Sequence, residues 1–525
     1  MKKTALSILL LMAVLGVRAV EFAVDGVNYK VTSSNTVSVL PYGTSGSSGG
    51  GITGLNNGYT GDIVIPETVT NKGVVYTVTA AEEETFSYSS KLTSVSLPAT
   101  VTELGEVPFE ACGKLAAITV HPDNPVYMSV DGVLFDKSGT TLIACPGAKE
   151  GEYLVPATVR TLAPSAFYGC SRLTSITLPE SLTEIGTDAF RSCTVLKSVN
   201  IPEGITEISD RLFYGCGFLQ SVSIPDGVVR IGASAFYNCK RMVLSALPSA
   251  LKSIGEHAFE RCAGILELTV PEGVQTIGNF AMMGCSSMQK VSLPASLNHL
   301  GIGTFRLCLS LQTIELNPAN THFVIEDGVL FNADKTSLIC CPATFKGEYA
   351  IPNTVTVIED YAFYYCQDLS KVMLPDNLVA IRNGVFTNCA SLESITIPES
   401  VTVIGENAFV SCTELKYILC KAGTPPSIAK ELFSPDAYED VVLYAPFKSK
   451  GDYASAEFWK KFQTFRGIGD VNQDGSLNVA DIMMLVNYVL AQSHFEVDEI
   501  VADVNYNSEV NVTDVMGVVK MAMGL

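Results

Sequence analysis

LPESLTEIGTDAFRSCTVLKSVN, residues 178–200, is followed directly by IPEGITEISDRLFYGCGFLQSVS, residues 201–223, and both segments carry the same apolar frame. A fixed short period with apolar residues at fixed offsets is typical of a solenoid. A unit of 23 residues cannot bury its apolar face alone, so each coil depends on its neighbours for stability. Seven cysteines mark the period without interruption: Cys170, Cys193, Cys216, Cys239, Cys262, Cys285 and Cys308.

Each coil is expected to contain one strand and one turn. The Leu-x-x-Ile-x-Leu segment after each cysteine, such as residues 173–178, predicts the strand. The Ala-Phe-x-x-Cys segment predicts a short helical or irregular turn packed behind that strand. Proline follows the strand at Pro179, Pro202 and Pro225, where it ends the ladder because it has no N–H to donate.

Two insertions interrupt the frame. The interval between Cys112 and Cys170 is 58 residues, and the interval between Cys308 and Cys366 is the same. Both intervals contain Asp-Gly-Val-Leu-Phe, at residues 131–135 and 327–331, so a long duplication overlies the short period. Strand-like runs flank each Asp-Gly pair, which predicts a β-hairpin or small meander at about residues 121–154 and 317–350.

The N-terminal residues and the composition indicate an exported protein. Residues 1–19 resemble a signal peptide, with Lys2-Lys3, an apolar run and a small-residue cleavage site. No apolar run is long enough to span a bilayer, so membrane insertion is not expected. The net charge of −20 disfavours nucleic acid as a partner and is compatible with cation binding.

The sequence contains two strings that match catalytic motifs, but neither has the flanking strand and helix that the motif requires. Residues 20–77 predict a β-rich N-terminal cap region, which contains a G-x-S-x-G string at residues 46–50 and a G-x-G-x-x-G string at residues 49–54. Both motifs require a strand before them and a helix after them, and this stretch is low in complexity. The five histidines form no visible triad. We therefore expect the chain not to be an enzyme.

The cysteines predict a buried ladder of thiols. Eleven of the 15 occupy one repeat position, and Cys145, Cys340, Cys341 and Cys420 lie outside it. Stacked coils place equivalent residues about 5 Å apart, which is within disulfide range in principle. Pairing neighbours would make alternate gaps unequal in a regular stack, so the thiols are expected to act as small apolar residues.

The strands predict a polar outer face. Small hydroxyl side chains dominate two columns of equivalent positions, and aromatic side chains are absent from both. Such a surface suits weak protein recognition, and it is equally what a solvated β-face looks like. The columns are Ser175, Ser198, Ser221, Leu244, Glu267, Lys290 and Thr313, and Thr177, Asn200, Ser223, Ala246, Thr269, Ser292 and Glu315.

From about residue 60 to 420 the frame, with its Ile-Gly-x-x-Ala-Phe-x-x-Cys core, resembles the BspA-like (Treponema-type) leucine-rich repeats of bacterial surface proteins. The resemblance implies a leucine-rich repeat solenoid at residues 78–418, and adhesion to a host matrix or surface protein. Ala163 and Ser209 replace the repeat's glycine, and Met282 replaces its phenylalanine, which loosens individual coils. Residues 419–468 resemble the terminal cap of such arrays.

The last segment, residues 469–525, has nine acidic residues and one basic residue, Lys520, and contains two matching loops. Oxygen side chains stand at loop positions 1, 3, 5, 9 and 12, an alternation that suits the oxygen shell of Ca²⁺. Each loop leads into an apolar-periodic helix. The oxygen side chains are Asp470, Asn472, Asp474, Asn478 and Asp481, and Asp503, Asn505, Asn507, Asn511 and Asp514.

This duplicated loop and helix resembles a type I dockerin, a small all-α calcium-binding module. The resemblance implies two Ca²⁺ sites held by the ten side chains above, with main-chain carbonyls from Ser476 and Glu509. Ser508 stands where the first loop has Gly475. Dockerins bind cohesin modules through their helix starts, commonly with Ser-Thr pairs, whereas this chain has Val-Ala at 479–480 and Val-Thr at 512–513.

Two functions remain open at this point. The first is a non-catalytic interaction or adhesion protein, secreted or on the surface of a bacterium, whose solenoid recognises a partner and whose dockerin-like module attaches it. The second is a scaffold or accessory component of an extracellular polysaccharide-degrading complex, recruited by a cohesin-like partner.

Overall fold

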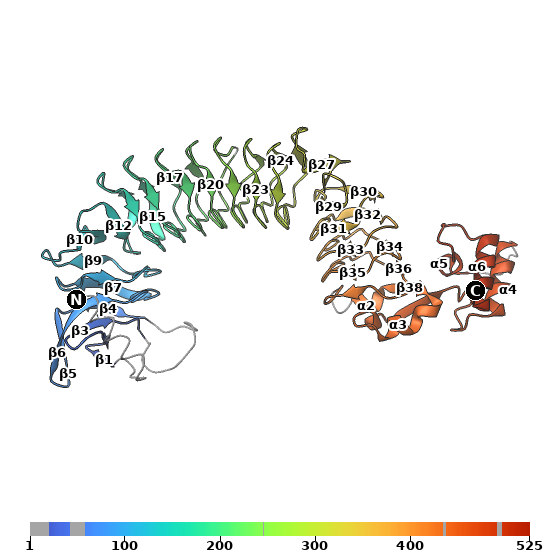
Figure 1. Ribbon diagram of the computed structural model, residues 1–525, viewed down its shortest axis with the longest axis horizontal. Coiled ribbons are helices and arrows are strands. Elements are labelled where there is room, and N and C mark those ends of the chain that lie inside the picture. The colour runs from blue at the N-terminus through green and yellow to red at the C-terminus, as the bar shows by residue number, and fades with distance from the viewer. Residues whose placement is uncertain (1–19, 43–57, 245, 434–436, 491–495, 525) are drawn as a thin grey trace, which may run out of the picture. The chain divides into compact units, whose positions relative to one another are not determined.

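The computed structural model describes residues 20–42, 58–244, 246–433, 437–490 and 496–524. The expected signal peptide and the two glycine-rich strings of residues 46–54 lie outside these ranges. The chain divides into two compact units, one ending at Gly264 and one beginning at Ile265, and each is described by itself (Figure 1). Among the described residues, no helix has the length and apolar character needed to cross a membrane.

In the first unit, the strands predicted after each cysteine stack in parallel. Val199 pairs with Ile176 on one side and Val222 on the other, so equivalent side chains of successive coils lie in register. The inward side chains alternate with exposed ones, as the period of two requires. The strands are β4 (Thr60–Val64), β7 (Lys91–Leu97) and β9 (Ala117–Val120), and β13 (Glu150–Leu154), β15 (Arg172–Thr177), β17 (Ser198–Asn200) and β19 (Ser221–Ser223).

A second parallel sheet, which the sequence did not predict, runs through the Glu-Ile positions of the coils. Each of its repeat strands has only two residues, too few to produce a visible alternation, yet Ile185 and Ile208 point inward and are buried. The strands of the first unit are β14 (Thr161–Leu162), β16 (Glu184–Ile185), β18 (Glu207–Ile208), β20 (Arg230–Ile231) and β21 (Ser253–Ile254).

The Ala-Phe-x-x-Cys segments are irregular turns rather than helices. Some of their N–H groups donate within the turn, as Arg191 N does to the Asp188 carbonyl oxygen at 2.9 Å. Others donate to the next coil: Asp188 and Phe190 donate to the carbonyl oxygens of Asp210 and Leu212 at 3.1 and 3.0 Å. Asp188 has a φ of +58°, and this left-handed position recurs in the coils. The turns therefore form a third hydrogen-bonded column between coils.

The repeat's glycine is required by close approach of neighbouring coils. A Cβ at Gly186 would lie 2.5 Å from the main-chain nitrogen of Pro164. Ser209, which was expected to loosen its coil, donates instead from its hydroxyl to the Ile185 and Gly186 carbonyl oxygens at 2.8 and 3.2 Å. The departure from glycine is thus compensated by a hydrogen bond between coils.

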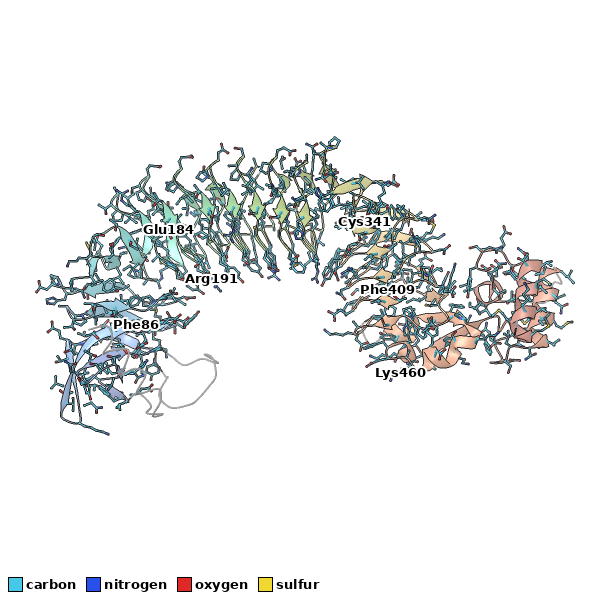
Figure 2. The ribbon with its side chains drawn as sticks, in the orientation of Figure 1. Phe86, Glu184, Arg191, Cys341, Phe409 and Lys460 are labelled. Atoms are coloured by element: carbon cyan, nitrogen blue, oxygen red, sulfur yellow. The ribbon has the colours of Figure 1, made fainter. Side chains whose placement is uncertain are left out.

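A stack of phenylalanine rings fills the interior. The Phe213 ring centroid lies 5.3 Å from that of Phe190 and 5.5 Å from that of Phe236, and all three side chains are fully buried. Figure 2 labels one member of this position in each unit, Phe86 and Phe409. Stacking of aromatic rings adds to the stabilisation that comes from the burial of apolar area, so the stack contributes to the stability of each unit.

The cysteines are thiols, as predicted. They do more than fill space, because the thiol donates a hydrogen bond to the carbonyl oxygen of the phenylalanine in the preceding coil. Cys216 reaches the Phe190 oxygen at 3.0 Å, and Cys389 in the second unit reaches the Phe363 oxygen at 3.2 Å. The ladder therefore satisfies main-chain acceptors inside the solenoid, a role that spacing alone did not reveal.

These buried thiols should make the protein sensitive to alkali. Burial raises the pKa of Cys216 to about 12. Thiols of an unfolded chain ionise near pH ~8.5, so the stabilising contribution is complete below that pH and is lost as the pH rises towards about 12. We expect the free energy of unfolding to fall across this window by about 1.4 kcal/mol per pH unit for each such thiol, and the urea midpoint to fall with it. The Cys216→Ser variant should show a shallower slope, and a constant midpoint up to pH ~11 would contradict this account.

The first unit begins with a mixed sheet and contains the first insertion. The cap strands β1 (Glu21–Val24), β2 (Val27–Val31), β3 (Thr36–Val39), β6 (Val74–Ala81) and β5 (Thr68–Asn71) follow that order, and β8 (Glu103–Leu104) also pairs with β6. The predicted hairpin is confirmed: β10 (Tyr127–Val130) pairs antiparallel with β11 (Val133–Asp136) across Asp131-Gly132, and β11 pairs antiparallel with β12 (Thr141–Ala144).

The second unit repeats this plan. Its predicted hairpin, β27 (Phe323–Glu326) with β28 (Val329–Asn332), is followed by β29 (Ser337–Cys340). The longer strands are β22 (Glu267–Thr269), β24 (Lys290–Leu293), β26 (Thr313–Leu316), β30 (Lys346–Ala350), β32 (Asp368–Met373), β34 (Ser394–Ile397) and β36 (Tyr417–Cys420). The two-residue strands lie in two separate sheets. In one, β23 (Thr276–Ile277) pairs with β25 (His299–Leu300). In the other, β29 is followed by β31 (Val357–Ile358), β33 (Ala380–Ile381), β35 (Val403–Ile404) and β37 (Ser427–Ile428).

Two further strands and several short helices close the array. The strands β38 (Val442–Pro446) and β39 (Thr464–Ile468) continue the parallel sheet beyond β36. Trp459 is buried against Tyr453 and donates from Nε1 to the Pro426 carbonyl oxygen at 2.7 Å. The cap helices are α2 (Ala437–Asp440), η1 (Phe447–Ser449), α3 (Lys450–Ser455) and η2 (Trp459–Lys461), and the terminal segment adds α4 (Val479–Val489), α5 (Glu499–Ala502) and α6 (Val512–Met523).

Candidate metal centre

The first acidic loop, residues 470–481, leads from β39 into α4. Its side-chain oxygens accept main-chain N–H groups within the loop: Asp470 Oδ2 from Gly475 at 3.0 Å, Asn472 Oδ1 from Asp474 at 3.0 Å, and Asp474 Oδ1 from Ser476 at 2.8 Å. These bonds fold the loop on itself and collect oxygen atoms at the start of the helix. Ca²⁺ prefers oxygen ligands of this kind, six to eight in number.

The carboxylate at loop position 12 is the most deeply buried group of this loop. Asp481 is fully buried and accepts from the main-chain nitrogens of Asn472 at 3.1 Å and Asn478 at 2.8 Å. Asn478 in turn accepts from Ala480 N at 2.8 Å and completes a capping box at the start of α4. Asp481 accepts one hydrogen bond from the loop residue Asn472 and one from Asn478, the N-cap residue of α4. It therefore positions the loop and the helix together.

The second loop, residues 503–514, reproduces this geometry before α6. Asp514 is fully buried and accepts from Asn505 N at 3.3 Å and Asn511 N at 3.0 Å, and Asn511 caps α6. Asp503 Oδ2 accepts from Ser508 N at 2.8 Å, and Asn507 Oδ1 accepts from Glu509 N at 3.0 Å. The two loops that the sequence singled out are therefore alike in hydrogen bonding as well as in spacing.

The acidic side chains of the first loop do not form a cluster of carboxylates. Within the described ranges, no three His, Cys, Asp or Glu side chains form a group that could hold a metal ion. Asp470, Asp474 and Asp481 are thus not brought together as a carboxylate cluster, since their oxygens are turned towards main-chain N–H groups. A metal site here would depend on asparagine amides and main-chain carbonyls as well, which Ca²⁺ accepts.

One carboxylate oxygen of this loop, Asp470 Oδ1, is in an environment that favours a bound cation. Asp470 is buried, and its Oδ1 has no hydrogen-bond partner. Burial raises the pKa of Asp470, and the nearby Asp481 and Asp474 carboxylates raise it further, against the Gly475 N–H, which lowers it. A buried carboxylate oxygen without a partner is costly unless a positive charge neutralises it. The residues of this loop therefore fit Ca²⁺.

The second loop contains a strained residue that a substitution should relieve. Ser508 has a φ of +67° at the position where Gly475 has +84°. The left-handed conformation costs a non-glycine residue about 1 kcal/mol, so Ser508→Gly should stabilise the terminal segment by up to this amount. Thermal unfolding monitored by the helical circular dichroism signal measures the gain. A lower midpoint than wild type would show that the serine side chain contributes more than its strain costs.

The helices of this segment bury one face and expose another. Leu485 of α4 and Val518 of α6 are fully buried together, which confirms the apolar periodicity predicted for both helices. The opposite faces carry apolar side chains that are 54–68% exposed and recur 33 residues apart. They form two equivalent sets, which we call the apolar stripes: Val479, Met483 and Leu490, and Val512, Met516 and Met523.

The terminal segment packs directly on the cap of the solenoid. β39 runs straight into the first loop, and Gly469 N donates to the Val501 carbonyl oxygen at 2.9 Å. Asp498 accepts from the Tyr444 hydroxyl at 2.9 Å and forms an ion pair with Arg466. Sequence reasoning missed this junction, because its residues are far apart in the chain and α5 has only four residues.

The polar columns predicted on the strands are on the outer surface. Ser198 and Asn200 flank the inward Val199, and both are exposed. In the second unit, Glu315 bonds with Lys290 at 2.7 Å and with Ser292 at 2.8 Å along this face. The face offers hydroxyl, amide and charged groups for recognition.

Comparisons with known proteins agree with this architecture. The family model of the BspA type leucine rich repeat region (6 copies) matches residues 67–130, 152–252, 232–350 and 344–454. The model of the dockerin type I domain matches residues 468–521. A comparison with curated proteins gives no match.

Several solved structures are similar to this chain. A leucine-rich repeat protein from Bacteroides ovatus is 22% identical, with 85% of this chain and 99% of that chain covered and a TM-score of 0.39. A leucine rich cell surface protein from Faecalibacterium prausnitzii is 22% identical, with coverage of 86% and 96% and a TM-score of 0.31. The repeat matches cover more than half of the sequence. The chain therefore belongs to the BspA type leucine-rich repeat family and carries a dockerin type I domain at its C-terminal end.

Proposed function

We propose that this chain is an exported, non-catalytic interaction protein that attaches to a protein partner through its calcium-loaded dockerin domain. Leucine-rich repeat and dockerin domains are non-catalytic and are typical of extracellular or cell-surface bacterial proteins. Calcium binding is a property of dockerin type I domains, and here the two loops would hold one ion each. The polar strand face of the solenoid remains available for recognition of a second protein, such as a host matrix protein.

The pair of apolar stripes carries this proposal. Exposed side chains of this size, repeated in both halves of a small domain, mark a surface that a partner covers. Each stripe lies on a helix whose start is fixed by a loop carboxylate, Asp481 or Asp514, so the shape of the surface depends on the loops. A cohesin-like module is the partner that such a domain implies, with Met483 and Met516 near the centre of the contact.

Binding of a panel of cohesin modules to the full chain tests the proposal. The double variant Met483→Lys/Met516→Lys should lose at least a hundredfold in affinity, because it places a charge in each stripe. Leu266→Lys, at an exposed residue of the solenoid, is the matched control and should bind like wild type. Chelation of calcium should abolish binding as well.

The outcomes separate the two functions. Cohesin binding that the double variant loses favours a component of an extracellular polysaccharide-degrading complex. If no cohesin binds while the chain adheres to matrix proteins through its solenoid, adhesion is favoured, and attachment through the dockerin domain is contradicted.

A further inference from the structure

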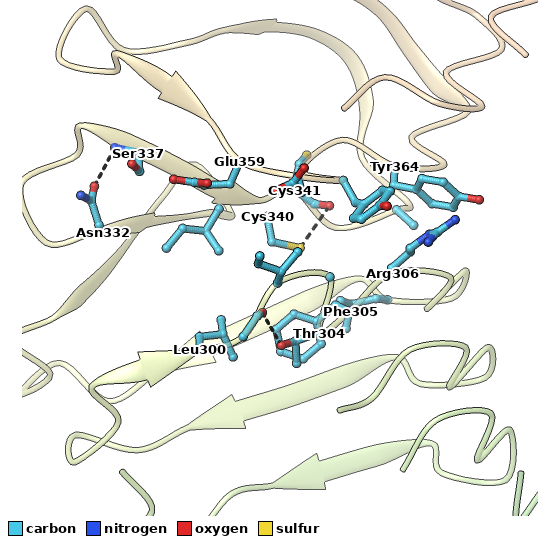
Figure 3. A pocket seen from close by; sticks show the side chains of 18 residues that line it. Leu300, Thr304, Phe305, Arg306, Asn332, Ser337, Cys340, Cys341, Glu359 and Tyr364 are labelled. Carbon is cyan, nitrogen blue, oxygen red and sulfur yellow. Dashed lines mark hydrogen bonds between the residues drawn. The ribbon is translucent and has the colours of Figure 1, made fainter. Parts of the chain in front are cut away.

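A cavity of about 230 Å³ lies in the second unit where the insertion interrupts the stack of coils (Figure 3). One wall is the turn at residues 300–306, and the other is formed by residues 339–343 and 359–364. Its floor is apolar, with Leu300, Phe305, Leu311 and Ile339 among the lining residues. The cavity arises because the inserted segment cannot continue the stacking of a regular coil.

An unpaired cation lies at the edge of this cavity. The Arg306 guanidinium carbon is 4.2 Å from the Tyr361 ring centroid and 4.8 Å from that of Tyr364. Arg306 Nε is buried without a hydrogen-bond partner, and the guanidinium forms no ion pair within the described part of the chain. Two rings hold the group in place, and none of the carboxylates in the described ranges lies within ion-pair distance of it.

The acidic groups of the cavity are already engaged elsewhere. Glu359 forms an ion pair with Arg382 at 2.9 Å. Asp360 accepts from Asn383 N at 3.0 Å. Glu359 is therefore neutralised by an arginine, and Arg306 and Asp360 are the lining charges without an ion pair among the described residues.

The first insertion supplies an internal comparison. Its hairpin has the same register. The two insertions are 196 residues apart, so Glu110 is at the position equivalent to Arg306, and Ser165 is at the position equivalent to Tyr361. Glu110 accepts from the Tyr88 hydroxyl at 3.0 Å and so has a partner within its own unit. The first unit also holds an arginine against tyrosine rings, because Arg191 lies 5.2 Å from the ring centroid of Tyr168, which stands 196 residues before Tyr364. Arg191, however, forms an ion pair with Asp188 at 3.2 Å, so the two insertions differ in whether the arginine has a carboxylate partner.

We propose that the cavity binds a small organic carboxylate. Its anion would accept hydrogen bonds from the Arg306 guanidinium, for which carboxylates are the matching planar partner. Its apolar body would lie against Leu300, Phe305 and Ile339, and the volume suits a ligand of about one ring. This site is separate from the dockerin domain and from the polar strand face.

Isothermal titration calorimetry with the full chain tests the site, with phenylacetate and its neutral counterpart phenylacetamide as probes. The acid should bind at least tenfold more tightly than the amide. Arg306→Gln should weaken binding of the acid at least tenfold and leave the amide unchanged. Arg241→Gln is the matched control, because Arg241 also stacks on a ring, that of Phe218 at 3.9 Å, but in the first unit.

The acid–amide comparison on the wild-type chain needs no variant, so it holds even if Arg306→Gln fails to fold. Equal affinity for acid and amide, or full retention of acid binding by Arg306→Gln, would overturn the proposal. Absence of binding of either probe at millimolar concentration would also overturn it.

Discussion

Asp481→Ala is expected to unfold the first loop and α4 while the solenoid stays folded. The substitution removes a fully buried carboxylate that bonds to Asn472 N and Asn478 N, and leaves both N–H groups without their partner. Hydrogen bonds to charged acceptors contribute about 1.5–3 kcal/mol each, so the loss of two should cost roughly 3–6 kcal/mol, in addition to any stabilisation that bound calcium supplies. A domain of this size has little stability in reserve.

Amide hydrogen exchange of the full chain measures this effect. Protection should disappear in α4 and persist in the strands of the solenoid. Glu496→Ala, at an exposed carboxylate of the same domain, is the control and should retain full protection. Unchanged protection of α4 in Asp481→Ala would show that the carboxylate does not hold the loop and the helix together.

Phe213→Ala is expected to cost about 3–5 kcal/mol, the largest effect of a single truncation in the solenoid. The ring is fully buried between those of Phe190 and Phe236, so its removal opens a cavity that rigid neighbouring coils cannot fill. Because coils support one another in sequence, the damage should spread to the adjacent coils.

Urea denaturation, with circular dichroism of the strands as the readout, gives the difference in free energy of unfolding. Phe218→Ala is the matched control in the same coil, since Phe218 is 43% exposed, and should cost less than about 1 kcal/mol. Equal costs for the two variants would contradict the role assigned to the phenylalanine stack.

The regular part of the fold was predictable because each coil repeats the same pattern of apolar and polar positions. Val199 had to be an inward strand residue, given its neighbours 23 residues away, and the Asp-Gly pairs fixed both hairpins. The second sheet was not predictable, because a two-residue strand such as Glu207–Ile208 has no pattern of its own. The conformation of the turns was predictable only in part, since some of their hydrogen bonds go to the next coil.

The candidate sites likewise contain some features that the sequence predicts and others that it does not. The loop oxygens and the buried faces of α4 and α6 follow from spacing within one segment, and the structure has both. The contact of Asp498 with Tyr444 and Arg466 joins residues 54 and 32 positions apart, beyond any local pattern. The cavity beside Arg306 arises from a break in stacking and depends on groups that only the fold brings together.

The most direct test of the account is calorimetric titration of calcium into the full chain and into its Asp470→Ala and Asp503→Ala variants. We expect two sites in the wild-type chain, one of which is lost in each variant, together with a gain in helical signal on binding. Absence of calcium binding by the wild-type chain would contradict it and would leave partner recognition to the solenoid alone.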